Sequence, residues 1–457
     1  MLYERNAGSY SLINALKNGG PIVWLSCIVM GLGNLVAGRF IMGLLMLAIE
    51  ILCLGFMFLP EAGGFHWLGL LPSLGDRMTE EVWNDAKGVY EYIQGDNSQQ
   101  ILLYAVASIV VLCVLAVIWW SSVRSGYYAL CLKKEGKHVP TFFEDVKSLL
   151  DQNIHKLFMV PPFVTLLIFT IIPLVYMMLM AFTNYSKVGD HLILFDWVGL
   201  ANFASLFNAG STIGKQFGSV LGWTLVWAFF ATFLNFFLGT FVALIIERKT
   251  TRLKGLWRTI LSLTIAVPQF VSLLIIRTMF KENGAVNTLF QSLGVLDHGE
   301  VFPFLTDAMW ARVLLIVINL WVGIPYTVMQ VTGILKNIPA DQYEAARIDG
   351  ANAVQQFMNI TLPYMLFVMT PYIITQFTGN INNFNIIYLL TGGGPTYVGD
   401  SAGQTDLLVT WLYKLSIDRQ EYNLGAVIGI FTFVVLSVVA LVTYRSSGSY
   451  KDEEGFK

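Results

Sequence analysis

The stretch KNIPADQYEAARIDG (residues 336–350) continues as ANAVQQFMNITLP (351–363) and lies between two long apolar segments. Pro339 suits a first helical turn, because that turn needs no backbone N–H from its early residues. Gly350 suits the left-handed position that commonly ends a helix. We therefore expect a helix, a glycine turn and a second short helix, about 352–361, that stops at the following proline. Such a helix–Gly–helix foot could be only a structural loop.

Apolar segments long enough to cross a bilayer flank this foot on both sides. The chain has 457 residues, of which 55% are hydrophobic and 13% charged, about half the charged share of a soluble domain. A membrane helix needs about 20 mostly apolar residues. Eight segments qualify: 40–59, 101–120, 158–182, 218–246, 259–280, 310–334, 364–390 and 423–444. The predicted fold class is an all-α integral membrane protein with about eight transmembrane helices.

One further segment, 22–37, is apolar but short, rich in glycine and followed by Arg39. We interpret it as re-entrant or interfacial, since a full extra span would reverse the parity of the others. The acidic 60–100 loop is expected to be a solvated external segment.

Lysine and arginine in the connections predict the orientation, because cytoplasmic loops are enriched in them. The 121–157 connection holds six and the short 247–258 connection holds five, whereas 281–309 holds one. The two basic loops are therefore expected in the cytoplasm. By parity, so are both termini and the 335–363 foot.

The sequence offers little to a catalytic or cofactor site. The four cysteines form no CxxC pair and the five histidines share no ligand spacing, so we expect no metal and no cofactor. A net charge of −2 does not favour nucleic acid. No phosphate-binding GxxxxGK[ST] motif is present, so an ATP-driven process would need a separate ATPase subunit.

Polar and helix-breaking residues concentrate in the later spans. Proline removes a backbone donor and clashes with the preceding turn, so Pro173, Pro268, Pro325 and Pro371 are expected to break their helices. In transporters such discontinuities cluster around the substrate path.

Side-chain amides are frequent in the sixth and seventh spans, which carry Asn319, Gln376, Asn380, Asn382, Asn383 and Asn385. Amides in hydrocarbon must be satisfied by partner helices, water or a ligand. Interhelical bonding is the simpler explanation for one asparagine. The local density of amides, interleaved with Phe377 and Phe384, favours a neutral, polyol-like substrate. A proton- or ion-driven carrier would need a relay of buried ionisable groups, and a membrane enzyme would need paired carboxylates or a metal motif. The spans offer neither.

The foot resembles the EAA signature of ABC importer permeases. Glu344-Ala345-Ala346, Gly350 and Ile360-x-Leu362-Pro363 match that signature at every fixed position. The resemblance implies a type I ABC importer permease core whose cytoplasmic coupling helix docks on an ATPase subunit. It gives the coupling role to Glu344, Ala345, Ala346 and Gly350.

Further matches resemble the MalF-type maltose/maltodextrin permease family. They include Ala266-Val267-Pro268, Asn319-x-Trp321-x-Gly323-x-Pro325-Tyr326 and Gly393-Gly394-Pro395. The resemblance covers about 158–445 and implies three parts: an N-terminal extension (1–157), the permease domain (158–445) and a cytoplasmic tail (446–457). By the same resemblance the sugar-contacting residues are Ile265, Gln269, Asn319, Val322, Gly323, Tyr326, Gln376, Gly379, Asn380 and Asn383.

The resemblance also implies partners and a place in the cell. They are a second, MalG-like permease subunit, two ABC ATPase subunits, an extracellular solute-binding lipoprotein and a maltodextrin-like oligosaccharide, in a bacterial cell membrane. Ile265 and Gly379 stand where the best-understood member has aromatic residues, so the exact sugar stays open. The alternative is another solute, either a different oligosaccharide or a glycerol-phosphate ester. An ester calls for Arg or Lys facing the cavity, and the candidate for that role is Arg277.

Overall fold

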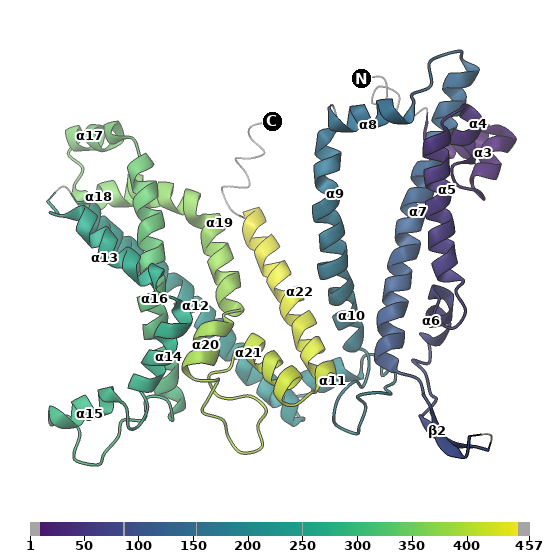
Figure 1. The fold of residues 1–457 in the computed structure, drawn as a ribbon. Coiled ribbons are helices and arrows are strands. Elements are labelled where there is room, and N and C mark those ends of the chain that lie inside the picture. The colour runs from purple at the N-terminus through teal and green to yellow at the C-terminus, as the bar shows by residue number, and fades with distance from the viewer. Residues whose placement is uncertain (1–9, 86, 152, 249, 447–457) are drawn as a thin grey trace. The chain divides into compact units, whose positions relative to one another are not determined.

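The computed structural model describes residues 10–85, 87–151, 153–248 and 250–446 (Figure 1). The chain divides between Gly199 and Leu200 into two compact units. The described residues are mostly helical, with one two-stranded sheet. The predicted all-α class is confirmed.

The first unit contains two long helices, a helix pair joined through a π-helical turn, several short helices and a hairpin. Its elements are α2 (Leu12–Asn18), α3 (Gly20–Ser26), α4 (Leu32–Ala37), α5 (Phe40–Met57), α6 (Gly64–Leu70), β1 (Glu80–Asn84), β2 (Val89–Ile93), α7 (Ser98–Lys134), α8 (Phe142–Leu150), α9 (Ile154–Leu166), the π-helical turn Leu167–Ile171 and α10 (Ile172–Met180).

Residues 22–37 form parts of α3 and α4, which are seven and six residues long and too short to span a membrane. The α4 helix packs closely on α7, because a Cβ added to Gly33 would lie 3.1 Å from the Cα of Gly126. The buried guanidinium of Arg39 donates to Asn34 and Ser125 and pairs with Asp145 of α8. The predicted short segment is thus folded against the spans of its own unit.

The second unit holds the remaining spans and the foot. Its elements are α11 (Ala201–Phe207), α12 (Thr212–Glu247), α13 (Lys254–Ala266), α14 (Gln269–Met279), α15 (Ala285–Ser292), α16 (Ala308–Asn337), α17 (Ala340–Ile348), α18 (Ala353–Gln356), the π-helical turn Phe357–Thr361, α19 (Leu362–Ile381), α20 (Phe384–Leu390), α21 (Leu408–Tyr413), the π-helical turn Lys414–Asp418 and α22 (Tyr422–Ser446). In Figure 1, α17 lies beyond the end of α16, at the opposite end of this unit from α15.

Among the described residues, seven helices are long and apolar enough to cross a membrane, and an eighth span exists if the bent pair α13–α14 is one span. Each of the eight predicted segments corresponds to one of them. Some helices outrun the prediction: α7 extends to Lys134 rather than ending near 120, since helix continues past the apolar part into polar sequence.

Of the four predicted helix breaks at proline, one is present and three are not. Pro268 separates α13 from α14 with a bend of 86°. Pro325 and Pro371, in contrast, lie inside the continuous helices α16 and α19. A proline inside a membrane helix is tolerated when neighbouring groups satisfy the freed carbonyl.

At Pro173 the helix continues without a break, and the π-helical turn Leu167–Ile171 lies just before the proline. Such a turn widens the hydrogen-bond ring and makes room for the proline ring. The same device precedes Pro363, so the second helix of the foot does not stop there as expected. It continues through Phe357–Thr361 into α19.

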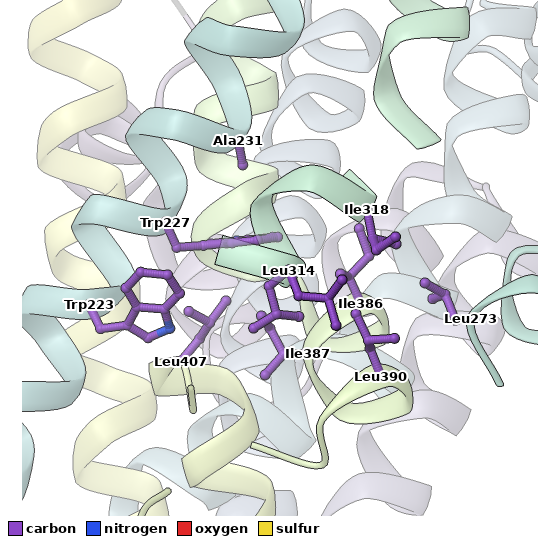
Figure 2. Close-up of a cluster of buried hydrophobic side chains, with 11 residues drawn as sticks. Trp223, Trp227, Ala231, Leu273, Leu314, Ile318, Ile386, Ile387, Leu390 and Leu407 are labelled. Carbon is purple, nitrogen blue, oxygen red and sulfur yellow. The ribbon is translucent and has the colours of Figure 1, made fainter. Parts of the chain in front are cut away.

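Two buried apolar clusters hold the second unit together, one on each side of its centre. The first joins α12, α14, α16 and α20 and is drawn in Figure 2, where Trp223 and Trp227 of α12 face Leu314, Ile387 and Leu407. The second joins α12, α16 and α19 through Phe236, Val328 and Met365. These clusters fix three long helices around the space between them.

Candidate functional site

A cavity of about 430 Å³ lies in the second unit between the two apolar clusters. Its walls come from α12, α13, α14, α16, α19 and the start of α20. Nine of the ten predicted sugar-contacting residues line it: Ile265, Gln269, Asn319, Val322, Gly323, Tyr326, Gln376, Asn380 and Asn383. Gly379 is not among the lining residues. Residues from four separate segments of sequence are thus brought to one space.

The break at Pro268 shapes one wall of this cavity. Ile265, Val267, Pro268 and Gln269 all line it, and they flank the point where α13 ends and α14 begins. An unbroken helix would leave no such recess, since its backbone groups would be bonded internally along the whole span.

The cavity lining described by the structure contains no Asp, Glu, Lys, Arg or His. Its polar groups are amides and hydroxyls, among them Tyr326, which is 46% exposed. Apolar and aromatic surface comes from Phe236, Trp321 and Tyr372. A lining of this kind offers hydrogen bonds and ring faces to a ligand, but no counter-charge.

Two of the predicted amides bond to α12 instead of pointing freely into the cavity. The Asn319 Nδ2 donates to the carbonyl of Ala231 at 3.3 Å, and the Asn380 Nδ2 donates to the Thr232 hydroxyl at 2.9 Å. Both asparagines are more than nine-tenths buried. For these two residues, the structure shows the interhelical bonding that the sequence left open.

The Asn383 side chain has a local task at the junction of α19 and α20. Its Oδ1 accepts the backbone N–H of Ile386 at 3.3 Å and so caps α20, while its Nδ2 lies 3.5 Å from the Asn380 Oδ1. The neighbouring amides of Asn382 and Asn385 are exposed and outside the cavity lining. The dense amide run of the seventh span therefore divides among several roles.

Three glutamines provide the unengaged amides of the cavity. Gln269, Gln330 and Gln376 line it, and no hydrogen bond within the described part of the chain engages their side chains. Gln330 and Gln376 are exposed to the cavity solvent. An exposed amide keeps its donors and acceptor available to a ligand hydroxyl.

The fourth span contributes a wall that sequence reasoning missed. Thr232, Asn235 and Phe236 of α12 line the cavity, together with Ser272, Thr327, Gln330 and Tyr372 from other helices. The sequence offers one indication of this wall, because Asn235 is the one amide side chain in the apolar run 225–239. Gly323 lets it approach α16, because a Cβ there would lie 2.4 Å from the Asn235 Nδ2.

The foot projects from the helices as the sequence predicts. Pro339 precedes α17, and Gly350 has φ +81°, the left-handed conformation. Glu344 and Ala345 are exposed, Ala346 is half-buried, and Ile348 is 87% exposed. Tyr343 ties the foot to the next helix through a 2.8 Å hydrogen bond with Thr361.

The chain is similar to known membrane transport proteins. The family described as "Binding-protein-dependent transport system inner membrane component" matches residues 235–447, which include most of the cavity and all of the foot. The galactooligosaccharides transport system permease protein GanP of Bacillus subtilis (strain 168) is 34% identical over 361 residues, covering 78% of this chain and 85% of that protein. This chain belongs to that family. It is a permease subunit of an ABC transporter and not an enzyme.

Other relatives of the permease extend over nearly its whole length. The maltodextrin transport system permease protein MdxF of Bacillus subtilis (strain 168) is 32% identical over 443 residues, covering 94% of this chain and 96% of MdxF. A solved bacterial alginate ABC transporter in complex with an alginate pentasaccharide-bound periplasmic protein has a chain with TM-score 0.54 and 22% identity. That match covers 66% of the permease and 96% of that chain. It shows a shared fold.

We predict that Gln376→Ala and Asn319→Ala separate ligand contact from helix bonding. Removing the unengaged Gln376 amide should lower uptake about 5-fold or more, because a substrate hydroxyl loses its partner. Removing Asn319 should instead lower the melting temperature of the assembled complex, since an interhelical bond in a membrane stabilises by about 0.6 kcal/mol and at most about 1.7. Equal melting-temperature losses, with equal uptake losses for every substrate, would contradict the division.

A second prediction concerns Gly350 in the foot. Gly350→Val should cut uptake per ATP hydrolysed, because a β-branched residue at positive φ costs about 1–2 kcal/mol. No atom lies within 4 Å of a Cβ built at this glycine, so the effect would come from backbone strain and not from a clash. Gly350→Asn is the matched control and should retain most coupling, since asparagine tolerates this conformation. Normal coupling in the valine variant would contradict the assignment.

Proposed function

We propose that this permease imports neutral oligosaccharides of the maltodextrin class through the cavity between α12, α16 and α19. The observation that carries the proposal is the lining formed by the described residues, in which amides, hydroxyls and aromatic rings meet without any Asp, Glu, Lys, Arg or His side chain. Amides and hydroxyls match sugar hydroxyls, while aromatic faces pack on the apolar faces of sugar rings. The named substrates of GanP and MdxF, galactooligosaccharides and maltodextrin, are of this chemical kind.

The alternative of a glycerol-phosphate ester is less well supported. A charged substrate needs a cationic partner once it leaves water, because burying an unpaired ion costs several kcal/mol. Arg277, the candidate cation, lies near the end of α14 and outside the cavity lining. Arg312 of α16 is also outside the lining, and its Nε donates to the Gln404 carbonyl. A different neutral oligosaccharide remains the second candidate, since Ile265 lines the cavity in place of an aromatic residue.

In the proposed scheme, the span Ala353–Leu390 connects the foot, which would contact the ATPase, with the cavity, which would contact the substrate. Gln269, Gln330, Gln376 and Tyr326 would contact the sugar directly, with Val322, Gly323 and Ile265 shaping the space. Asn319, Asn380 and Asn383 would hold the walls in register. Gly379 would contact the sugar only in another conformation or at a subsite beyond this cavity.

The proposed assembly has a second, MalG-like permease, two ABC ATPase subunits on the foot and an extracellular solute-binding lipoprotein. Glu344, Ala345, Ala346 and Gly350 would form the ATPase contact. The exposed Ile348 and Val354 add apolar surface to it. The proposed division of the chain remains 1–157, 158–445 and 446–457, although residues 447–457 lie outside the described part of the structure.

The function is tested by uptake into liposomes that contain the purified complex and its binding protein. We expect transport of neutral maltodextrins of two lengths and at least about 100-fold slower transport of a uronic acid oligosaccharide of matched length, because several kcal/mol separate them in an uncharged cavity. Transport of the acidic sugar or a glycerol-phosphate ester at the neutral rate would overturn the proposal. The neutral sugar without ATP is the control.

The proposed orientation places both termini and the foot in the cytoplasm of a bacterial cell. In a background in which the four native cysteines are replaced, Gln342→Cys should react with an impermeant maleimide only after the cells are permeabilised. Tyr92→Cys, an exposed position near the base of the β1–β2 hairpin, is the matched external position and should react in intact cells. The reverse pattern would invert the orientation and remove the coupling role of the foot.

A further inference from the structure

The β1–β2 hairpin of the first unit exposes nearly all of its side chains. Its strands pair antiparallel from Glu80↔Ile93 to Asn84↔Val89. Eight of the ten strand residues are exposed, and the other two, Asn84 and Glu91, are half-buried. An isolated two-stranded hairpin is marginally stable in water. Something beyond its own strands must hold this one in shape.

Hydrogen bonds of Asp76 and Arg77 with Asp96, here called the clasp, join the two ends of the hairpin at its base. The Arg77 Nη2 donates to the Asp96 Oδ1 at 2.8 Å, and the backbone N–H groups of Asp76 and Arg77 donate to the other carboxylate oxygen at 3.2 Å. The Arg77 carbonyl accepts from the Asp96 backbone at 2.8 Å. Hydrogen bonds from Arg77 hold the pKa of Asp96 below its usual range, so the clasp stays charged at neutral pH. The hairpin is therefore pre-organised at its base.

One face of the hairpin is aromatic. Residues paired directly across an antiparallel ladder point to the same face, so Trp83↔Tyr90 and Glu81↔Tyr92 share one face. The Trp83 and Tyr90 rings meet edge to face with centroids 4.9 Å apart. Trp83, Tyr90 and Tyr92 are 48%, 61% and 71% exposed. This aromatic face is Glu81, Trp83, Tyr90 and Tyr92.

The hairpin is also acidic. Residues 76–96 contain six acidic and two basic side chains. Lys87 pairs with Glu91 at 2.7 Å on the opposite face, whereas Glu80, Glu81 and Asp85 join no ion pair in the described part of the chain. These free carboxylates border the aromatic face at one end and the turn at the other.

We propose that the aromatic face of the hairpin binds the extracellular solute-binding protein. The surface of that protein in contact with the hairpin would be basic, with pockets that receive the aromatic rings. The inference rests on the proposed function and orientation, which put the hairpin outside the cell. Tyrosine and tryptophan dominate the energetics of protein interfaces. The family to which the chain belongs is by its description dependent on a binding protein. The free carboxylates select a partner of opposite charge and speed its encounter.

Other occupants fit the hairpin less well. A free sugar needs a concave site that covers most of its surface, and no hairpin residue lines any of the five cavities considered among the described residues. A lipid surface is disfavoured, because segments that lie on membranes are rich in Lys and Arg, whereas this hairpin is acidic. Figure 1 also shows the hairpin projecting past the ends of α5 and α7 in its own unit, beyond the apolar part of the spans.

The proposal is tested by measuring the affinity of the sugar-loaded binding protein for the complete complex in nanodiscs. Trp83→Ala and Tyr92→Ala should each weaken binding about 10-fold or more, as expected for interface aromatics. Val82→Ala, on the opposite face, is the matched control and should change affinity less than about 2-fold. Glu80→Gln with Glu81→Gln should flatten the fall of affinity with rising salt. Basal ATP hydrolysis should be unchanged in all variants.

A photo-crosslinking amino acid at position 92 provides a second measurement that does not depend on hairpin stability. It should capture the binding protein, whereas the same group at position 91 should not. Unchanged affinity in both aromatic variants, or capture from 91 and not from 92, would overturn the docking role. Failure of the sugar proposal would look different: the complex would bind its solute-binding protein normally but transport another solute.

Discussion

Side-chain amides of α16 and α19 bond to one turn of α12, and these contacts set the positions of the three helices that form the cavity walls. Asn319 of α16 bonds to the Ala231 carbonyl and Asn380 of α19 bonds to the Thr232 hydroxyl, one residue further along. The Trp227 Nε1 on the preceding turn donates to the Asn380 carbonyl at 3.1 Å. In hydrocarbon, polar groups cannot form hydrogen bonds with water, so they must bond to each other. Such bonds therefore fix how far one helix is shifted along its neighbour. The cavity walls are held by these bonds, and the unengaged glutamines can then face inward.

Backbone irregularity is used in two different ways in this chain. At Pro268 the helix breaks by 86° and leaves a recess beside the cavity. Before Pro173 and Pro363 the backbone widens by a π-helical turn and the helix continues. The second case matters for coupling, because residues Ala353–Leu390 form one span from the foot to Asn383. In the proposed assembly, a movement of the foot would reach the cavity through this helix, which begins just after the Gly350 turn.

The sequence predicted the parts of this molecule that depend on strong local patterns. Eight apolar runs located the spans, and Pro339 with Gly350 located the foot and its left-handed turn. Nine of the ten predicted sugar-contacting residues line the cavity, but Gly379 does not, and the α12 wall and several residues of other helices were missed. Thr232 and Phe236 carry no signal in an apolar helix, and Asn235 would be read alone as interhelical bonding. These positions become a wall only when the packing of α12 on α16 is known.

What the sequence did not predict was how each amide is used. Asn319, Asn380 and Gln376 look equivalent in the chain, yet two bond to α12 and the third has no partner among the described residues. Whether an amide is bonded depends on whether another helix places a polar atom within about 3 Å of it. The spacing of residues along the sequence does not contain that information. The fates of Pro325 and Pro371 depend in the same way on surroundings, since helix breaking is decided by whether nearby groups satisfy the freed carbonyl.

The absence of acidic and basic side chains from the described cavity lining has an electrical consequence. Moving one elementary charge across a membrane exchanges about 2.3 kcal/mol with every 100 mV of potential. A neutral solute passing an uncharged lining moves no charge through that field. The membrane potential can then neither drive nor oppose the passage of the solute itself, and a cell whose potential collapses would still hold the same affinity for its cargo at this point of the path.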